Sequence, residues 1–196
     1  LQWNRQGLLI QRSDCCGSIT RFCYDRFGQL VSSEDAEGHV TRRAWNDAGQ
    51  LCEIIYPDTR REIFQWHAGD QLSLWRDAAG CEIHWQWNAS GQPLSQTDRN
   101  GHTRRWHYDA RGNLLRLENS NGGEYHFSYD ATGHLLGETR PDNTARKFLW
   151  DERGFLSSVQ EQGRPYSGCD ASSRRQQFSY DDSGQLTARH HLHAEY

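Results

Sequence analysis

Short runs of alternating polar and apolar residues fill most of the chain, separated by turn-like tetrapeptides. In "FSY", for example, Phe127 and Tyr129 flank a serine, and this period of two places both rings on the same face of a strand. No stretch of 11 residues shows the sustained i, i+3, i+4 apolar spacing of an amphipathic helix. The pattern therefore predicts a succession of β-strands.

The strands belong to a repeat of 21 residues. An aromatic residue opens each repeat, Asp or Asn usually follows it, Gly stands four residues after it and Leu six residues after it. One interval is nine residues longer, because Tyr180 opens its repeat thirty residues after Trp150. The opening aromatics are Trp3, Tyr24, Trp45, Trp66, Trp87, Tyr108, Tyr129, Trp150 and Tyr180.

Asp-x-x-Gly is the signature of a type I turn that ends in a glycine bulge. The Asp side chain accepts hydrogen bonds from N–H groups of the turn, and Gly supplies the positive φ. In such a hairpin the residue before Asp faces the residue two after Gly, so Tyr24 is expected opposite Leu30 and Trp45 opposite Leu51. Each pair contributes about 0.2–1 kcal/mol relative to alanine.

A second turn near the middle of each repeat makes the chain a series of hairpins. The residues expected to form the turns are Asp25, Gly28, Asp35, Gly38, Gly49, Asp77, Gly80, Asp98, Gly101, Asp109, Gly112, Asp130, Gly133, Asp151, Gly154, Asp181 and Gly184. The residues expected on the aromatic and leucine face are Trp3, Tyr24, Leu30, Trp45, Leu51, Trp66, Leu72, Trp85, Trp87, Trp106, Tyr108, Leu114, Phe127, Tyr129, Leu135, Phe148, Trp150, Leu156, Phe178, Tyr180 and Leu186.

The expected fold is all-β: one continuous array of about nine hairpin units over residues 1–196, with a loop insertion at 159–176 inside the unit opened by Trp150. A flat sheet of about eighteen strands is unusual, so the array is expected to curl. Since the chain starts and stops within the pattern, we expect it to be a piece of a longer wall.

Composition narrows the function classes. The net charge of −4 gives no electrostatic case for nucleic acid, and no apolar run reaches the length of a membrane span. Hydrophobic residues make up only 35 %, yet eight are Trp, which favours an ordered chain with few but large packing residues.

The motif [Tyr/Trp]-[Asp/Asn]-x-x-Gly-x-Leu, with a second Gly ten residues further on, resembles the YD repeat, also called the Rhs repeat. Sequence segments such as "YDARGNLLRLENSNGG" and "WNDAGQL" are most similar to bacterial Rhs proteins, with toxin-complex C proteins and teneurins as more distant relatives. The resemblance covers almost the whole chain. It implies a spiralling β-sheet wound into a hollow shell.

In bacterial members such a shell encloses a C-terminal toxin that is made in the cytoplasm, secreted and often delivered to rival cells by type VI secretion. The resemblance thus implies a non-catalytic structural segment of this shell. The implied partners are the rest of the shell, the enclosed toxin, and a secretion spike or chaperone that binds other parts. The self-cleaving Asp-Pro-x-Gly-Leu segment of the family is absent from this sequence.

The residues themselves give little reason to expect an enzyme. Carboxylates such as Asp25 and Asp109 could be the paired acids of a glycosidase, but they recur at one register, which favours turn capping. His191 and His193 share a strand face, but two ligands fall short of a zinc site. The six cysteines lack any C-x-x-C, so we expect free thiols, no metal and no cofactor, with one or two disulfides as the alternative.

Two binding hypotheses remain open. Arg164, Tyr166, Arg174 and Arg175 around the insertion could form a contact loop, although a tolerated insertion at a hairpin tip explains them as well. The aromatic rows could also bind carbohydrate or a surface receptor, whereas the simpler interpretation is the packed face of the sheet.

Overall fold

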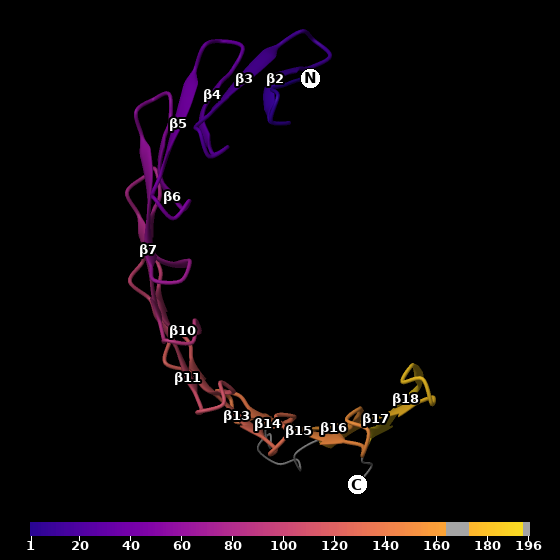
Figure 1. Cartoon of the computed structure of the whole chain (residues 1–196). Helices are drawn as coiled ribbons and strands as arrows, with labels where there is room; N and C mark the ends of the chain where they lie inside the picture. The colour runs from indigo at the N-terminus through magenta and orange to yellow at the C-terminus, as the bar shows by residue number, and fades with distance from the viewer. Residues whose placement is uncertain (164–172, 194–196) are drawn as a thin grey trace. The chain divides into compact units, whose positions relative to one another are not determined.

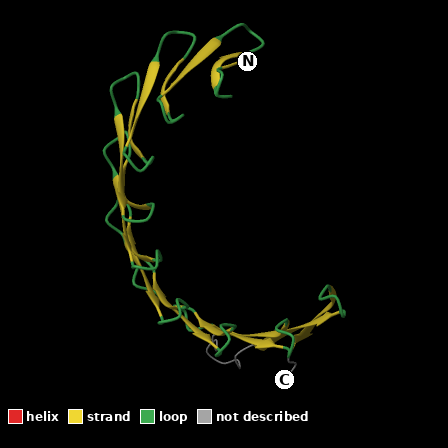
Figure 2. Cartoon of the chain, viewed as in Figure 1, coloured by secondary structure: helices red, strands yellow, loops and turns green. Residues whose placement is uncertain are grey.

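The computed structural model describes residues 1–163 and 173–193 of the chain. The described residues form eighteen β-strands and no helix, which confirms the all-β prediction (Figure 2). They divide into two compact units, Leu1–Gly101 and His102–Tyr196. In both units each strand pairs antiparallel with the next one in sequence, so consecutive hairpins lie side by side (Figure 1).

The first unit contains ten strands, and its row of hairpins follows a bent path (Figure 1). They are β1 (Gln2–Trp3), β2 (Leu9–Ser13), β3 (Ile19–Tyr24), β4 (Leu30–Glu34), β5 (Val40–Trp45), β6 (Leu51–Ile55), β7 (Arg61–His67), β8 (Gln71–Arg76), β9 (Glu82–Trp87) and β10 (Pro93–Thr97).

The second unit contains eight strands and continues the same alternation. They are β11 (Thr103–Tyr108), β12 (Leu114–Glu118), β13 (Glu124–Tyr129), β14 (Leu135–Thr139), β15 (Ala145–Trp150), β16 (Leu156–Gln162), β17 (Ser173–Tyr180) and β18 (Leu186–His193).

The strand register follows from the first turn of each repeat. Tyr24 lies opposite Leu30 and Trp45 opposite Leu51, and in both hairpins the register shifts by one residue just before the aromatic. This shift is the bulge that a type I turn followed by a left-handed Gly produces. All nine opening aromatics pair with the residue six positions later, Pro93 standing in for Leu opposite Trp87.

The turns are held by a repeated set of hydrogen bonds. At the first of them, Oδ1 of Asp25 accepts from the N–H groups of Phe27 and Gln29, both at 2.9 Å. The Gly28 N–H donates to the Asp25 carbonyl at 3.2 Å, with Gly28 at φ +83°. Glycine is suited to this position because it has no Cβ to clash at positive φ.

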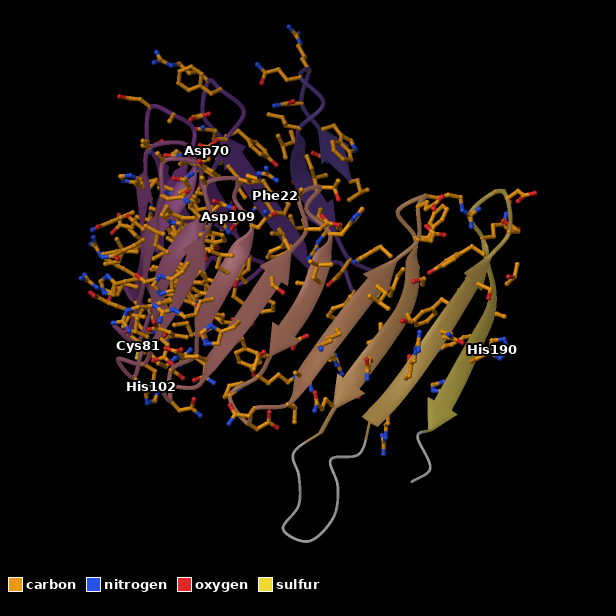
Figure 3. The ribbon with its side chains drawn as sticks, turned by 90° about the horizontal axis from the view of Figure 1, so that it is seen from below. Phe22, Asp70, Cys81, His102, Asp109 and His190 are labelled. Carbon is orange, nitrogen blue, oxygen red and sulfur yellow. The ribbon has the colours of Figure 1, made fainter. Side chains whose placement is uncertain are left out.

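Three non-glycine residues take the same left-handed conformation: Thr59, Asp70 and Asn143, with φ of 70°, 64° and 63°. Asn and Asp tolerate this region, but Thr59 is β-branched and is strained there. Asp70 marks one end of the strands in its unit and Cys81 the other; in the second unit Asp109 and His102 mark opposite ends in the same way (Figure 3). The first and second turns of each repeat therefore lie at opposite ends of the strands.

The sheet has almost no interior. Leu74 is the one buried hydrophobic residue and Ser158 the one buried polar residue among the described positions. The solvent-accessible area of the chain is 13610 Å², whereas a compact monomer of this mass exposes about 9600 Å². Within each unit the described residues form a single layer of hairpins, which explains an excess of about 4000 Å².

The insertion lengthens the two described strands of its hairpin. Residues 159–162 belong to β16 and residues 173–176 to β17, which with seven and eight residues are longer than most strands of the array. Cross-strand pairing continues out to Gln162 and Ser173. The remainder of the expected insertion, residues 164–172, lies outside the described residues.

Candidate functional site: the aromatic face

One face of each unit carries the opening aromatics, and we call it the aromatic face. Phe64 and Trp66 of β7 lie opposite Trp75 and Leu72 of β8, so four large side chains meet there. The other face is more mixed: Gln65 and His67 of β7 are polar and exposed, but Ile63 and the buried Leu74, which lies opposite Gln65, are also there. The alternation predicted from the sequence thus separates the two faces of the sheet.

The opening aromatics also join successive repeats. The Trp66 indole Nε1 donates to the Leu51 carbonyl at 2.7 Å, and the Tyr24 hydroxyl donates to the Leu9 carbonyl at 2.9 Å. In each case the acceptor is the Leu that faces the opening aromatic of the preceding repeat. The same bond is made by Trp45, Trp87, Trp150 and Tyr180. This ladder of hydrogen bonds fixes six of the hairpins against the one before them.

A second contact between repeats involves the residue that follows the turn Gly. His134 stacks on Trp150 with ring centroids 4.7 Å apart, and Phe155 stacks on Tyr180 at 5.0 Å. Phe155 also covers Gly184, where an added Cβ would come within 2.7 Å of the Phe155 ring. The sequence motif left this position open, because the Gln, Asn, Leu, His and Phe residues that occupy it share no single chemistry.

Glu62 is an acid on the aromatic face that sequence reasoning also missed. Its carboxylate accepts from the Tyr56 hydroxyl at 2.6 Å and from the Trp75 indole Nε1 at 3.1 Å. This hydrogen bond to the Glu62 carboxylate raises the pKa of the Tyr56 phenol. Glu62 serves as an acceptor for two aromatic donors, and it left no repeating signal because the equivalent positions of the neighbouring repeats are Thr41 and Ile83.

The turn carboxylates are unsuited to donate protons. The Asn113 side-chain amide donates to Asp109 at 2.9 Å and lowers the pKa of that carboxyl, and the Phe155 backbone N–H likewise lowers the pKa of Asp151. A hydrogen bond from the Thr132 hydroxyl lowers the pKa of Asp130. These groups are ionised near neutral pH and hold turns, whereas a general acid needs a raised pKa.

Histidines and cysteines form no metal centre in the described part of the chain. No group of three His, Cys, Asp or Glu residues there could hold an ion. His39 instead contacts Asp35 at 3.1 Å within its own turn. Cys15 and Cys16 lie in one turn with their Sγ atoms 3.9 Å apart, and the five described cysteines are free thiols. Cys169 and the side chain of His193 lie outside the described residues.

The expected contact loop is only partly described. Arg164 and Tyr166 lie outside the described residues. Arg174 pairs with Glu161, which lies on the aromatic face, whereas the adjacent Arg175 pairs with Gln160 on the opposite face. The structure therefore does not bring these two arginines together. Arg174 instead lines a cavity of about 280 Å³ with Arg146 and Arg189.

A groove lies on the polar face of the second unit. It has a volume of about 420 Å³ and is lined by Leu136, Leu149 and Lys147 around Gly137. Leu149 and Leu136 are among the exposed large hydrophobic residues of the chain.

No helix of the described chain has the length and hydropathy needed to cross a membrane.

Comparison with protein families gives the RHS repeat, which matches residues 24–61, 87–124 and 108–145. No curated protein matches the chain.

Among solved structures, the crystal structure of TcdB2-TccC3-Cdc42 has a TM-score of 0.51 and 18% identity, with 90% of this chain and 9% of that chain covered. The Photorhabdus luminescens Tc holotoxin pore with a mutated TccC3 has a TM-score of 0.52 and 16% identity, with 89% and 9% covered. These similarities establish the fold. This chain spans less than a tenth of the length of either of those chains.

Proposed function

Because this chain belongs to the RHS-repeat family, we propose that it is a non-catalytic segment of a β-shell wall that encloses a C-terminal toxin polypeptide. In this proposal the chain pairs at both ends with further repeats of the same shell. The toxin would be made and enclosed in the cytoplasm of a bacterium and then secreted with the shell for use against competitors, with type VI secretion as one route.

The observation that carries the proposal is the lack of an interior. Within each unit no described residues form a second layer over the partly buried aromatic face, and the accessible area of the chain exceeds that of a compact monomer by about 4000 Å². Monomeric proteins rarely expose large contiguous apolar surface, so such a face points to a covering partner. An enclosed polypeptide would cover one face of a wall along its entire length, as a small ligand could not.

A rigid wall is also what the contacts between repeats favour. Within each unit neighbouring hairpins are joined by strand pairing, and six of the opening aromatics add a hydrogen bond to the preceding Leu carbonyl. In solenoid-like arrays stability comes from such nearest-neighbour contacts, and any number of units can be added. The turn carboxylates are occupied in holding this frame, which leaves them no catalytic role.

The proposal is tested on the parent polypeptide that contains this chain. Its reading frame is extended past residue 196, the protein is purified whole, and the downstream polypeptide is followed during limited proteolysis. We expect that polypeptide to resist trypsin in the parent and to be cleaved rapidly when expressed alone. A reading frame without a further polypeptide, or equal cleavage rates in the two settings, would contradict the proposal.

A matched pair of variants shows whether the wall provides the protection. Trp66→Ala removes an opening aromatic and its bond to Leu51, and Gln65→Ala changes the adjacent residue on the polar face. Protection is expected to weaken in Trp66→Ala and to stay unchanged in Gln65→Ala. Loss of protection in neither variant would separate the protection from this wall.

Carbohydrate or receptor binding by the aromatic face is the alternative function. It is favoured by Trp85 and Trp87, which line a cavity of about 340 Å³ together with His67 and Gln86 of the opposite face. The Trp87 indole N–H already donates to the Leu72 carbonyl at 2.8 Å, so stacking on the ring rather than hydrogen bonding would have to hold a sugar. A glycan array with the Trp85→Ala and Trp87→Ala variants tests it: binding that both variants abolish would favour this alternative.

A further inference from the structure

The cavity beside Arg174, which we call the arginine cavity, is a positively charged concave site of the aromatic face. It has a volume of about 280 Å³ and spans β15 to β18. Three of its lining residues are arginines, namely Arg146, Arg174 and Arg189, and Glu161 is its one carboxylate.

Strand register explains why these arginines meet. Arg146 of β15 lies opposite Glu161 of β16, which in turn lies opposite Arg174 of β17. Arg189 of β18 lies opposite Phe178, two residues along β17 from Gln176. All of these positions belong to the aromatic face, because pairing across antiparallel strands keeps partners on the same side.

Positive charge in the cavity is only partly neutralised. Glu161 accepts a hydrogen bond from Arg146 at 3.0 Å and also lies 3.7 Å from Arg140, so it is shared between two guanidinium groups. Arg189 donates to the neutral Gln176 side chain at 2.9 Å. Arg174 is exposed and makes neither an ion pair nor a hydrogen bond with the described residues. The three lining arginines and Glu161 carry a net charge of +2 near neutral pH.

We propose that the arginine cavity binds a polyvalent oxyanion, meaning a ligand that presents phosphoryl or carboxylate oxygens. The planar guanidinium donates two parallel hydrogen bonds to such groups, and Arg is the residue best suited to this recognition. A bound anion would relieve the repulsion between Arg174 and its two neighbours. The cavity is larger than one phosphate group needs, which favours an anion with two or more oxyanion centres. This inference concerns binding alone and does not depend on the shell function.

Isothermal titration of the full chain with pyrophosphate, at constant ionic strength in 0.15 M KCl, tests the proposal. We expect saturable binding that Arg174→Gln weakens about tenfold or more, since the variant loses a charge-assisted hydrogen bond to the anion. Arg175→Gln is the matched control, because it removes the same charge from the same strand but on the opposite face. It is expected to leave binding nearly unchanged.

A second variant guards against loss of binding through misfolding. Glu161→Gln removes the carboxylate that competes for Arg146 and Arg140, so it is expected to tighten pyrophosphate binding several-fold. Damage to the fold would not produce such a gain. Citrate in a parallel titration distinguishes the sources: the tighter of the two probes identifies phosphoryl or carboxylate groups as the preferred chemistry.

Three results would overturn the inference. They are the absence of saturable binding of either probe, an equal loss in Arg174→Gln and Arg175→Gln, and weaker binding in Glu161→Gln. The second would mean that only the overall charge of the sheet attracts the anion.

Discussion

Tyr180→Phe isolates one rung of the hydrogen-bond ladder. The Tyr180 hydroxyl donates to the Leu156 carbonyl at 3.0 Å, and the ring lies opposite Leu186 and stacks on Phe155. Phenylalanine keeps the ring, its stacking and its cross-strand partner, so the change removes a single hydrogen bond. A hydrogen bond of this kind contributes about 0.5–1.5 kcal/mol net, and we expect a loss of about 1 kcal/mol in the free energy of unfolding.

Tyr129→Phe is the matched control for this substitution. Tyr129 opens its repeat in the same unit and lies opposite Leu135 in the same register. Its hydroxyl makes no hydrogen bond with the described residues, and burial raises the pKa of the phenol. Removing an oxygen that has no protein partner costs no intramolecular bond, so the free energy of unfolding is expected to stay within about 0.5 kcal/mol of the unchanged chain.

Thermal unfolding and native-state hydrogen exchange measure the two effects. A loss of 1 kcal/mol lowers the melting temperature of a chain of this size by about 2–4 °C. Because repeat arrays open locally, amide exchange in β16 and β17 reports the lost rung more directly than a global transition. Equal effects of Tyr180→Phe and Tyr129→Phe, or faster exchange only in the latter, would refute the assignment of the ladder as a stabilising contact.

Three further predictions concern the turns. Gly184→Ala and Gly133→Ala both place a side chain at positive φ, but only Gly184→Ala pushes Phe155 off its stacking position. In urea unfolding we therefore expect Gly184→Ala to lose about 0.5–1.5 kcal/mol more in the free energy of unfolding than Gly133→Ala. Equal losses would contradict the packing argument. Thr59→Gly relieves a strained left-handed residue and is expected to raise the free energy of unfolding by about 0.5–1 kcal/mol in urea unfolding. The reason is that the relief of about 1–2 kcal/mol exceeds the entropic cost of Gly. A lower free energy of unfolding in the variant would show that Thr59 is not strained. Because the folded pKa of turn residues such as Asp109 is lowered below the unfolded value of about 3.9, their contribution is complete above that pH and is lost as the pH falls through the folded value. The melting temperature should therefore decrease when the pH is lowered below about 4. Asp109→Asn keeps the capping oxygen but has no carboxyl to protonate, so it should make this decrease less steep. An unchanged pH profile in the variant would argue against this linkage.

The sequence by itself determined the hairpins and their register. Asp25 and Gly28 specify a turn whose geometry depends on neighbouring residues only, so the pairing of Tyr24 with Leu30 follows from local chemistry. The twofold alternation then decides which side chains share a face. Such features repeat every 21 residues, and repetition makes a local signal readable in a single sequence.

Contacts between repeats were decided by the tertiary structure. The bond from Trp66 to the Leu51 carbonyl and the stacking of Phe155 on Tyr180 join residues of different hairpins, and their geometry depends on side-chain rotamers that no turn motif encodes. The same holds for Glu62, whose two aromatic donors come from the turn after β6 and from β8.

The insertion shows the limit of the periodic argument. Beyond Trp150 the count of residues no longer gives the register, so the sequence grouped Arg174 and Arg175 as one contact site. Pairing between β16 and β17 places them on opposite faces and brings Arg174 toward Arg146 instead. Local turn chemistry determines which residues lie opposite each other within one hairpin. The neighbours of a side chain on more distant strands are determined only when those strands have paired.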